Sequence, residues 1–445
     1  MYQIYVIFLV ILSFLPDWGF IYRGNTKPTI SFPEIGVALL IIIWFFHKIT
    51  EENLKVKKIS INMFFLIVSI ILIATLGASL HYNQVNWIEH VKSSIKLLFW
   101  GIFIFCWIDI LEDISSNFKI SNKAWKFYIN FALLISGIAI FQYIFYKFTG
   151  LHLRLNPFVN QSWGAIGGNY RAMAIYGEPS WLGVILLPPL ISQGELFLRF
   201  NKFSYLSKFL FLLVGVIVSF SLASFIVLGI WGGFVLLKLF INSFSMFLLP
   251  KIKKKKIQAI FVVFCLIIIG GLIFLWWIYP LIIPRISIEV NNLVSNLAGE
   301  RQVLTSGSKR FASYEGFWAV LKNSPIFGVG FDQVKYISSL TGKYFEATTS
   351  GIFGFIGTSA GILGLFLFFY ILKFIWNGSK SRKETIKSDH QSELIVAGRA
   401  IVLALFLEQL FLYAGILNSD FWLPLAFAYL FIRSGYSKKA ELHTE

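Results

Sequence analysis

The residues best suited to chemistry lie in the segment RAMAIYGEPSWLG, from Arg171 to Gly183. Pro179 is favoured in the first turn of a helix, because its missing N–H would find no partner there, and we expect Glu178 to cap that helix. A helix N-terminus presents free N–H groups and a partial positive charge, and Arg171 adds a permanent cation. The segment therefore predicts a binding site for an anion such as a phosphate.

A second interpretation of the same segment is purely structural. If the residues before the helix are themselves helical, Arg171 and Glu178 share one face and form a surface salt bridge next to a capped helix. Trp181 is then typical of the aromatic belt at a membrane interface. Glycines upstream, at Gly164, Gly167 and Gly168, allow the backbone to turn sharply or to approach a ligand. Which interpretation holds depends on the structure of the elements around the segment.

Those elements are apolar. Hydrophobic residues make up 57% of the 445 positions and charged residues only 14%, whereas a soluble protein carries about 25% charged residues. Apolar runs long enough to cross a bilayer recur along the whole chain. We therefore predict an all-α polytopic membrane protein, with residues 1–445 forming a single integral membrane domain. The net charge of +17 is better explained by membrane topology than by binding to nucleic acid, because Lys and Arg gather in short loops.

About twelve transmembrane helices are predicted, and the break between the seventh and eighth falls at Ser219–Ser221. The predicted spans are Ile4–Leu15, Ile35–Phe46, Ile61–Leu80, Ile95–Leu111, Phe127–Phe148, Trp181–Leu198, Tyr205–Ser219, Ser221–Phe240, Ile257–Tyr279, Gly351–Ile371, Ile395–Leu417 and Phe421–Phe431. With both termini in the cytoplasm, most of the 39 Lys and Arg residues fall on the inner side, as membrane topology favours.

Two long outer loops, 149–180 and 280–350, follow from this topology, and we expect both to carry short helices. In the second, SYEGFWAVLKNSP has apolar residues at helical spacing and predicts an amphipathic helix on the membrane surface. The same loop contains Arg301, Lys309 and Arg310, a basic cluster on the side where topology does not favour one. An outer-leaflet pyrophosphate would explain it, since arginine binds phosphate oxygens in a fork. We interpret the following GVGFDQ as a turn.

Few ionisable residues lie inside the spans. Glu408, beside Gln409, is the one acid deep in a span, where such groups face a cavity or a partner; functional and structural roles remain equally open for it. Asp109 and Glu195 lie near inner helix ends and are expected to be solvated. Cys106 and Cys265 are expected to be small core residues. The outer histidines, His81, His90 and His152, are expected to form hydrogen bonds or interfacial contacts rather than to act as bases.

The order of these motifs resembles the O-antigen polymerase and ligase superfamily. The resemblance rests on Arg171 followed by GEPSWLG, on the spacing of Arg310, Trp318, Pro325, Gly328 and Gly330 in the large loop, and on a Gly-rich re-entry at SAGILG. The predicted spans and the position of the large loop agree with it along nearly the whole chain. Each motif is short and weakly specific alone, and their order and placement carry the resemblance.

The resemblance implies a Wzy-type polymerase that joins undecaprenyl-pyrophosphate-linked repeat units into an O-antigen, capsule or exopolysaccharide, at the outer face of the cytoplasmic membrane. The donor is already activated, so no metal, nucleotide or other cofactor is expected. Arg171 and Arg310 are then expected to stabilise the leaving pyrophosphate, with Glu178 as first candidate for the general base. Arg301, Lys309, Ser180, Trp181 and Glu408 are the expected substrate-binding residues.

The expected partners are the two lipid-linked oligosaccharides, membrane lipids, and a chain-length regulator and flippase of the same pathway, with no nucleic acid. One departure bears on the activity. Ligases of this family carry a histidine before the tenth span, where this chain reads FEATTSGIFGF with Glu346 as the nearest ionisable group. A polymerase is therefore favoured over a ligase. A transporter or lipid flippase is the alternative from another class, and a non-catalytic scaffold for glycan assembly is a further one.

Overall fold

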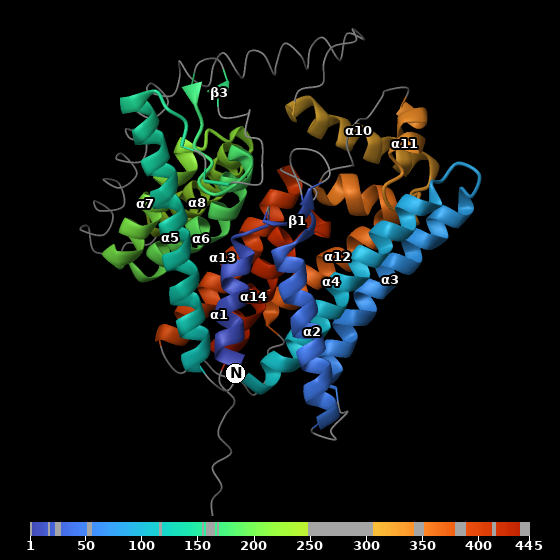
Figure 1. The fold of residues 1–445 in the computed structure, drawn as a ribbon, viewed down its shortest axis with the longest axis horizontal. Helices are drawn as coiled ribbons and strands as arrows, with labels where there is room; N and C mark the ends of the chain where they lie inside the picture. Colours follow the sequence, from blue (N-terminus) through green and yellow to red (C-terminus); the bar gives the residue numbers. More distant parts are fainter. Residues whose placement is uncertain are drawn as a thin grey trace, which may run out of the picture. The chain divides into compact units, whose positions relative to one another are not determined.

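The structure is a computed structural model of the chain (Figure 1). It describes residues 2–16, 18–22, 28–50, 56–114, 118–153, 155–156, 165–166, 169–247, 306–341, 351–378, 389–411 and 415–436. The chain divides into two compact units, which are considered separately. Unit 1 comprises residues 1–224 and 312–445, and unit 2 comprises residues 225–311.

Helices dominate the described residues. The α-helices are α1 (Tyr2–Ser13), α2 (Phe32–Thr50), α3 (Lys58–Leu80), α4 (Trp87–Ile114), α5 (Phe118–Thr149), α6 (Pro179–Phe200), α7 (Phe203–Val218), α8 (Leu222–Phe247), α10 (Ser306–Asn323), α11 (Val334–Thr341), α12 (Thr358–Asn377), α13 (Asp389–Phe411) and α14 (Ser419–Gly435). A π-helical stretch (Ile352–Gly357) precedes α12, and a short 3-10 helix (Gly415–Leu417) precedes α14.

Six helical segments in the described residues are long and apolar enough to cross a membrane. They are Phe32–Thr50, Lys58–Leu80, Trp87–Leu111, Lys119–Thr149, Pro179–Phe200 and Ile352–Asn377. The chain is therefore an all-α membrane protein. Each predicted span overlaps a helix of the described residues except the ninth, Ile257–Tyr279, which lies outside them. The number of crossings and their orientation stay predictions, because only these six helical segments of the described residues meet the criteria of length and hydropathy.

Two short antiparallel β pairs interrupt the helices. Strand β1 (Gly19–Tyr22) pairs with β2 (Pro28–Ser31), and β3 (Ala165–Ile166) pairs with β4 (Asn169–Tyr170). The second pair corrects one expectation, because the described residues between α5 and α6 form this pair and turns instead of short helices. The large loop does carry helices, α10 and α11. Helix α10 contains the predicted amphipathic helix, with Gly316, Phe317 and Val320 on its buried face and Trp318 exposed.

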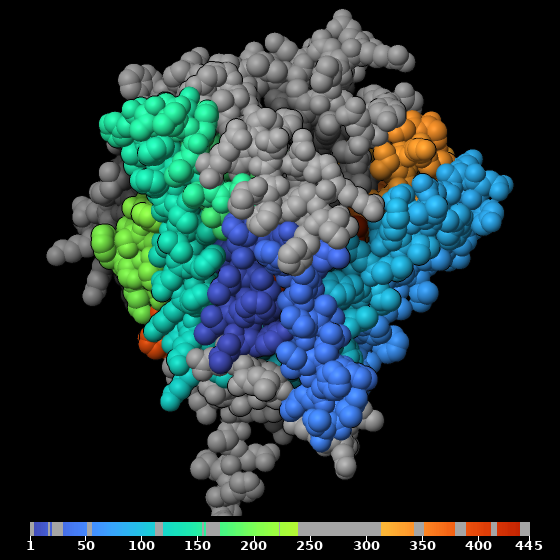
Figure 2. Space-filling model, viewed as in Figure 1, coloured from blue at the N-terminus to red at the C-terminus, as the bar shows by residue number. Residues whose placement is uncertain are grey.

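Helix α14 forms the centre of unit 1, and every one of its residues is buried. It packs against α1, α4, α5, α12 and α13 (Figure 1). Aromatic rings fill this core: Phe427 contacts Trp107 and Tyr128, and the indole N–H of Trp107 donates to the Ala426 carbonyl at 2.9 Å. Helices α1 and α2 lie side by side on one face, next to α5 and to the α3–α4 pair respectively (Figure 2).

Two backbone breaks shape the helices of unit 1. The predicted break between α7 and α8 is confirmed, with Phe220 in the left-handed region at φ 47°. Helix α12 is broken at Gly361, whose φ of 61° and ψ of −157° belong to a region that only glycine populates readily. The segment Pro325–Gly330 uses the carbonyls around this break, because Val329 N–H donates to Thr358 at 2.9 Å and Gly330 N–H donates to Ser359 at 3.0 Å.

The expectation that Asp109 is solvated is wrong. Its side chain has no exposed surface and accepts hydrogen bonds from Trp44 Nε1 and from Lys57 N, each at 3.0 Å, while Lys48 Nζ lies 3.0 Å from Oδ2. A buried carboxylate needs such partners because desolvation is costly. Asp109 therefore ties the ends of α2 and α4 to the start of α3. Cys106, one turn earlier, is buried as expected, and Cys265 lies outside the described residues.

Candidate functional site

The segment before α6 is an irregular turn that is held in place by hydrogen bonds from the side chain of Gln142 of α5. The side chain of Gln142 is completely buried. Its Oε1 accepts from the backbone N–H groups of Met173 at 3.2 Å and Ala174 at 2.7 Å, and its Nε2 donates to the carbonyls of Leu153 at 3.1 Å and Ala174 at 2.8 Å. Ala174 has a positive φ of 50°, which a non-glycine residue keeps only when its surroundings hold it. The turn is therefore fixed in one conformation.

This turn corrects the idea that Arg171 and Glu178 share a helical face, because residues 171–178 are not helical. The hydrogen bonds shown for the two side chains go to different groups. Arg171 Nε donates to the Ser219 carbonyl at 3.2 Å, and Glu178 accepts from the hydroxyl of Ser180 at 3.1 Å. Arg171 is 8% exposed, so the guanidinium is held inside unit 1 at the break between α7 and α8. A buried arginine stays charged and calls for an anion or carbonyl partners.

The first turn of α6 follows the predicted pattern in part. Glu178 occupies the N-cap position and Pro179 begins the helix, but the Glu178 side chain caps no backbone N–H. Its carboxylate lies instead on Ser180. Trp181 is only 9% exposed, which corrects its expected place in an interfacial belt. Gly183 allows close packing, since a Cβ there would meet Ser224 Oγ at 2.2 Å.

Glu408 belongs to the same region of unit 1. It is 3% exposed, and its Oε1 has no hydrogen-bond partner among the described residues. Helices α6 and α13 pack together with Ser192 Oγ on the Ala397 carbonyl at 3.2 Å. Lys202, just beyond the end of α6, pairs with Glu393 near the start of α13, so the helices are antiparallel. At 1.5 Å per residue, this register brings Glu408 to the height of the first turns of α6.

The basic cluster of the large loop is largely beyond what the structure describes. Arg301 lies outside the described residues. Lys309 and Arg310 belong to the helical backbone of α10, but their side chains lie outside the described residues. These two residues also belong to unit 2, so their position relative to Arg171 is not determined. The proposed pairing of Arg171 and Arg310 therefore stays a prediction.

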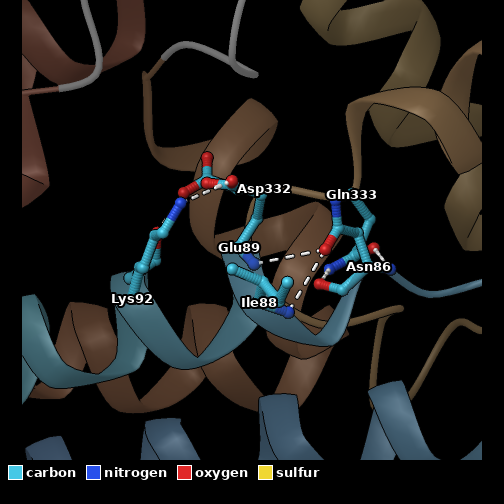
Figure 3. Close-up of polar contacts among 7 residues, drawn as sticks. Asn86, Ile88, Glu89, Lys92, Asp332 and Gln333 are labelled. Atoms are coloured by element: carbon cyan, nitrogen blue, oxygen red, sulfur yellow. Dashed lines mark hydrogen bonds and ion pairs between the residues drawn. The ribbon is translucent and has the colours of Figure 1, made fainter.

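A second polar cluster, not foreseen from the sequence, forms where the predicted GVGFDQ turn packs on α3 and α4. His90 of α4 accepts from Phe331 N–H on Nδ1 at 3.0 Å and lies 3.1 Å from Thr75 Oγ1 through Nε2. Because Nδ1 accepts, the ring proton of the neutral form resides on Nε2. Gln333 and Asn86 hold the end of the turn through two hydrogen bonds, at 2.7 and 3.1 Å (Figure 3).

Asp332 lies in this turn next to Glu89 and Lys92 of α4 (Figure 3). Its φ is 54°, its Oδ2 accepts from the Ser93 hydroxyl, and its buried Oδ1 has no hydrogen-bond partner among the described residues. Burial raises the pKa of Asp332, and nearby Glu89 adds to this, while Ser93 and Lys96 oppose it. A strained residue with a perturbed carboxyl group is typical of functional sites.

The three histidines that were predicted to lie on the outer side make the hydrogen bonds and ring contacts expected of them. His90 is buried and hydrogen-bonded, and His81 Nδ1 lies 3.2 Å from the Tyr336 hydroxyl. Burial lowers the pKa of His81. His152 packs against the rings of Tyr146 and Tyr170. Only a turn was predicted at GVGFDQ. Its polar partners lie about 240 residues away in the sequence, so no local pattern indicated them.

Compared with models of known protein families and with curated proteins, the chain matches none of them.

Proposed function

We propose that the chain is a glycosyltransferase of the polysaccharide polymerase type, which joins lipid-linked oligosaccharide repeat units at the outer face of the cytoplasmic membrane. One observation carries the proposal: a buried arginine, Arg171, in a turn that Gln142 fixes directly before the N-terminus of α6. The permanent cation and the helix N-terminus provide positive potential in a region with little water. The leaving group in this reaction is a pyrophosphate, which needs that potential as its bond breaks.

The reaction proposed is attack of an acceptor sugar hydroxyl on the anomeric carbon of the donor glycan. The anomeric C–O bond to the lipid pyrophosphate breaks, and the pyrophosphate leaves as an anion. In this proposal Arg171 stabilises that anion. Glu178 takes the hydroxyl proton, and Ser180, which bonds to its carboxylate at 3.1 Å, orients it. Ser180 and Trp181 at the start of α6, and Glu408 at the same height on α13, are proposed to line the glycan site.

A second candidate, a lipid or glycan transporter, is favoured by different observations. Helix α12 is broken at Gly361, and Glu408 is a buried acid within a predicted span. Broken helices and buried acids in spans are typical of transporters. The carbonyls at the break, however, already accept from Val329 and Gly330, so the break serves the packing of the large loop. We therefore rank transport second.

The test is a deletion strain complemented with single variants, with surface polysaccharide and lipid-linked glycans sized on gels. Arg171→Ala is expected to leave single repeat units on the outer leaflet and to abolish polymer. Arg171→Lys keeps the positive charge but lacks the forked donor geometry of the guanidinium, and it is expected to restore little polymer synthesis. Glu178→Gln tests the base, and full activity of that variant would remove Glu178 from the mechanism. Long polymer stranded on the carrier lipid would indicate a ligase, and single units trapped on the inner leaflet would indicate a flippase.

A further inference from the structure

The break between α7 and α8 supplies carbonyl partners for the turn that contains Arg171. Helix α7 ends at Val218, with Ser219 as its C-cap, and α8 begins at Leu222. In a continuous helix the carbonyls of Val218 and Ser219 would accept from N–H groups four residues later. Here the Val218 carbonyl accepts from Ala172 N–H at 2.9 Å, and the Ser219 carbonyl accepts from Arg171 Nε at 3.2 Å. The break therefore makes two backbone acceptors available to two consecutive residues of the turn.

The break depends on the backbone of Phe220. Its φ of 47° lies in the left-handed region, which is unfavourable for an L-residue because the Cβ approaches the following carbonyl oxygen. Four non-glycine residues in the described part of the chain have a positive φ. Ala174 lies in the turn of Arg171, and Phe220 directly follows the residue whose carbonyl binds the guanidinium. Strained backbone of this kind gathers at functional sites, where the surrounding structure holds it in place.

Buried serines hold the break in this conformation. Ser219 Oγ donates to the carbonyl three residues earlier at 2.6 Å and accepts from Ser221 N–H at 3.3 Å. Ser224 Oγ donates to Ser221 Oγ at 3.0 Å, and each of these serines is at most 2% exposed. Phe220 is half-buried, and the centroid of its ring lies 6.0 Å from that of Tyr143. Its side chain makes none of these hydrogen bonds, so the requirement at position 220 is a backbone that adopts a positive φ.

The same break also positions the start of α6. Gly183 packs against it so closely that a Cβ there would meet Ser224 Oγ at 2.2 Å and Ser221 Cβ at 2.9 Å. The N-terminus of α6 is the second source of positive potential in the proposed pyrophosphate site. One segment, Ser219–Ser224, therefore sets where the arginine and the helix N-terminus lie relative to each other. The segment is at the predicted outer end of the seventh span, on the side where the proposed reaction takes place.

We infer that Phe220 is a positioning residue of the proposed glycosyl transfer: its left-handed backbone places the Ser219 carbonyl on Arg171 and so orients the guanidinium toward the leaving pyrophosphate. The inference rests on the proposed function. It makes conformation, and not side-chain size, the requirement at position 220. β-Branched residues are the hardest to place in the left-handed region, and glycine adopts it readily.

The test compares substitutions at position 220 in the complemented deletion strain and in the purified full chain. Leucine and isoleucine have the same atoms and differ in branching at Cβ, so their comparison separates conformation from size. Phe220→Leu and Phe220→Gly are expected to keep most of the polymer. Phe220→Ile is expected to lower it at least about tenfold, because a misplacement of about 1 Å can cost about 100-fold in rate.

Inorganic pyrophosphate is the probe for the alignment of Arg171, and its binding is measured by titration calorimetry at fixed ionic strength. Phe220→Ile is expected to bind it at least about fivefold more weakly than the wild type, because the fork of the guanidinium is misaligned, and Phe220→Gly is expected to bind it normally. The matched control is Asn201→Ile, since Asn201 at the other end of α6 is also left-handed, with a φ of 51°. It is expected to lower the melting temperature and to leave polymer and pyrophosphate binding unchanged.

Equal polymer and equal pyrophosphate binding in Phe220→Leu and Phe220→Ile would overturn the inference. So would a folded Phe220→Gly protein that loses both, because the ring and not the backbone would then be required; this comparison decides even if Phe220→Ile fails to fold. Arg171→Ala separates the inference from the proposed function. Normal polymer in Arg171→Ala would remove the proposed function itself, whereas loss of polymer in Arg171→Ala with normal polymer in Phe220→Ile would remove only the role of Phe220.

Discussion

Replacing Gln142 by Met tests whether one buried side chain fixes the turn that contains Arg171. Methionine keeps the length of the side chain and removes all four hydrogen bonds to the backbone of residues 153, 173 and 174. Each such bond contributes about 0.5–1.5 kcal/mol net, so their sum is about 2–6 kcal/mol. Part of this is regained if the turn moves into contact with water. We expect a loss of about 2–4 kcal/mol.

The assay is thermal unfolding of the purified protein in detergent. Unfolding is monitored by the change in fluorescence as buried tryptophan side chains become exposed. For a chain of 445 residues, a loss of this size corresponds to a lower melting temperature by about 2–4 °C. The matched control is Gln193→Met in α6. Gln193 is also buried, but its Oε1 has no hydrogen-bond partner among the described residues, so its replacement is expected to be neutral.

The same variant separates structure from activity. If the hydrogen bonds of Gln142 position Arg171, then Gln142→Met abolishes polymer in the complementation assay at a temperature at which the protein is still folded. Equal melting temperatures for Gln142→Met and Gln193→Met would refute the reasoning that the turn depends on Gln142. Unchanged polymer in a folded Gln142→Met protein would show that the position of Arg171 is unimportant for the reaction.

Three further predictions concern other parts of unit 1. Asp109→Asn removes the counter-charge of Lys48, whose side chain is only 12% exposed, and is expected to cost about 3 kcal/mol in unfolding free energy; the double variant with Lys48→Met should recover part of this, and no recovery would argue against the pair. Because the pKa of Asp332 is raised in the folded state, its stabilising proton is lost as the pH rises through that raised value, so stability falls over this range. Asp332→Asn should abolish this fall in a pH series of melting curves, and an unchanged pH profile would contradict the assignment. Gly361→Ala places a Cβ 2.4 Å from the Ile326 carbonyl in a backbone region reserved for glycine, and is expected to lower the yield of folded protein; a normal yield and melting temperature would show that the break can relax.

The helices were predictable because their signal is local. Apolar runs marked each described helix that coincides with a predicted span, and length alone indicated the break that the structure shows at Phe220. Pro179 marked the start of α6 for the same reason, since a proline acts on its own turn. The β pair before α6 escaped prediction because each of its strands has two residues, too few to show an alternating pattern.

The candidate site was predictable as a position and not as a set of contacts. One of the two interpretations had Arg171 and Glu178 on one face of a helix, and Ala174 at a positive φ shows that the segment between them is not helical. The partners that the structure gives them, Ser219 for one and Ser180 for the other, depend on how α7 meets α6. A similar failure concerns Asp109, whose partners come from two other segments of the chain.

These failures have a common physical origin. In a bilayer the lipid is as apolar as the helices, so the apolar faces that form a soluble core do little to select one helix pairing over another. The selection falls to the few buried polar groups, such as Gln142 on the turn at Ala174, Trp107 on the Ala426 carbonyl, and Gln333 on Asn86. Each of these groups has an ordinary appearance in the sequence, because its partner is 32, 319 or 247 residues away. The residues that specify this fold are therefore the ones that a local pattern describes least well, and substitutions at them should change helix pairing before they change helix content.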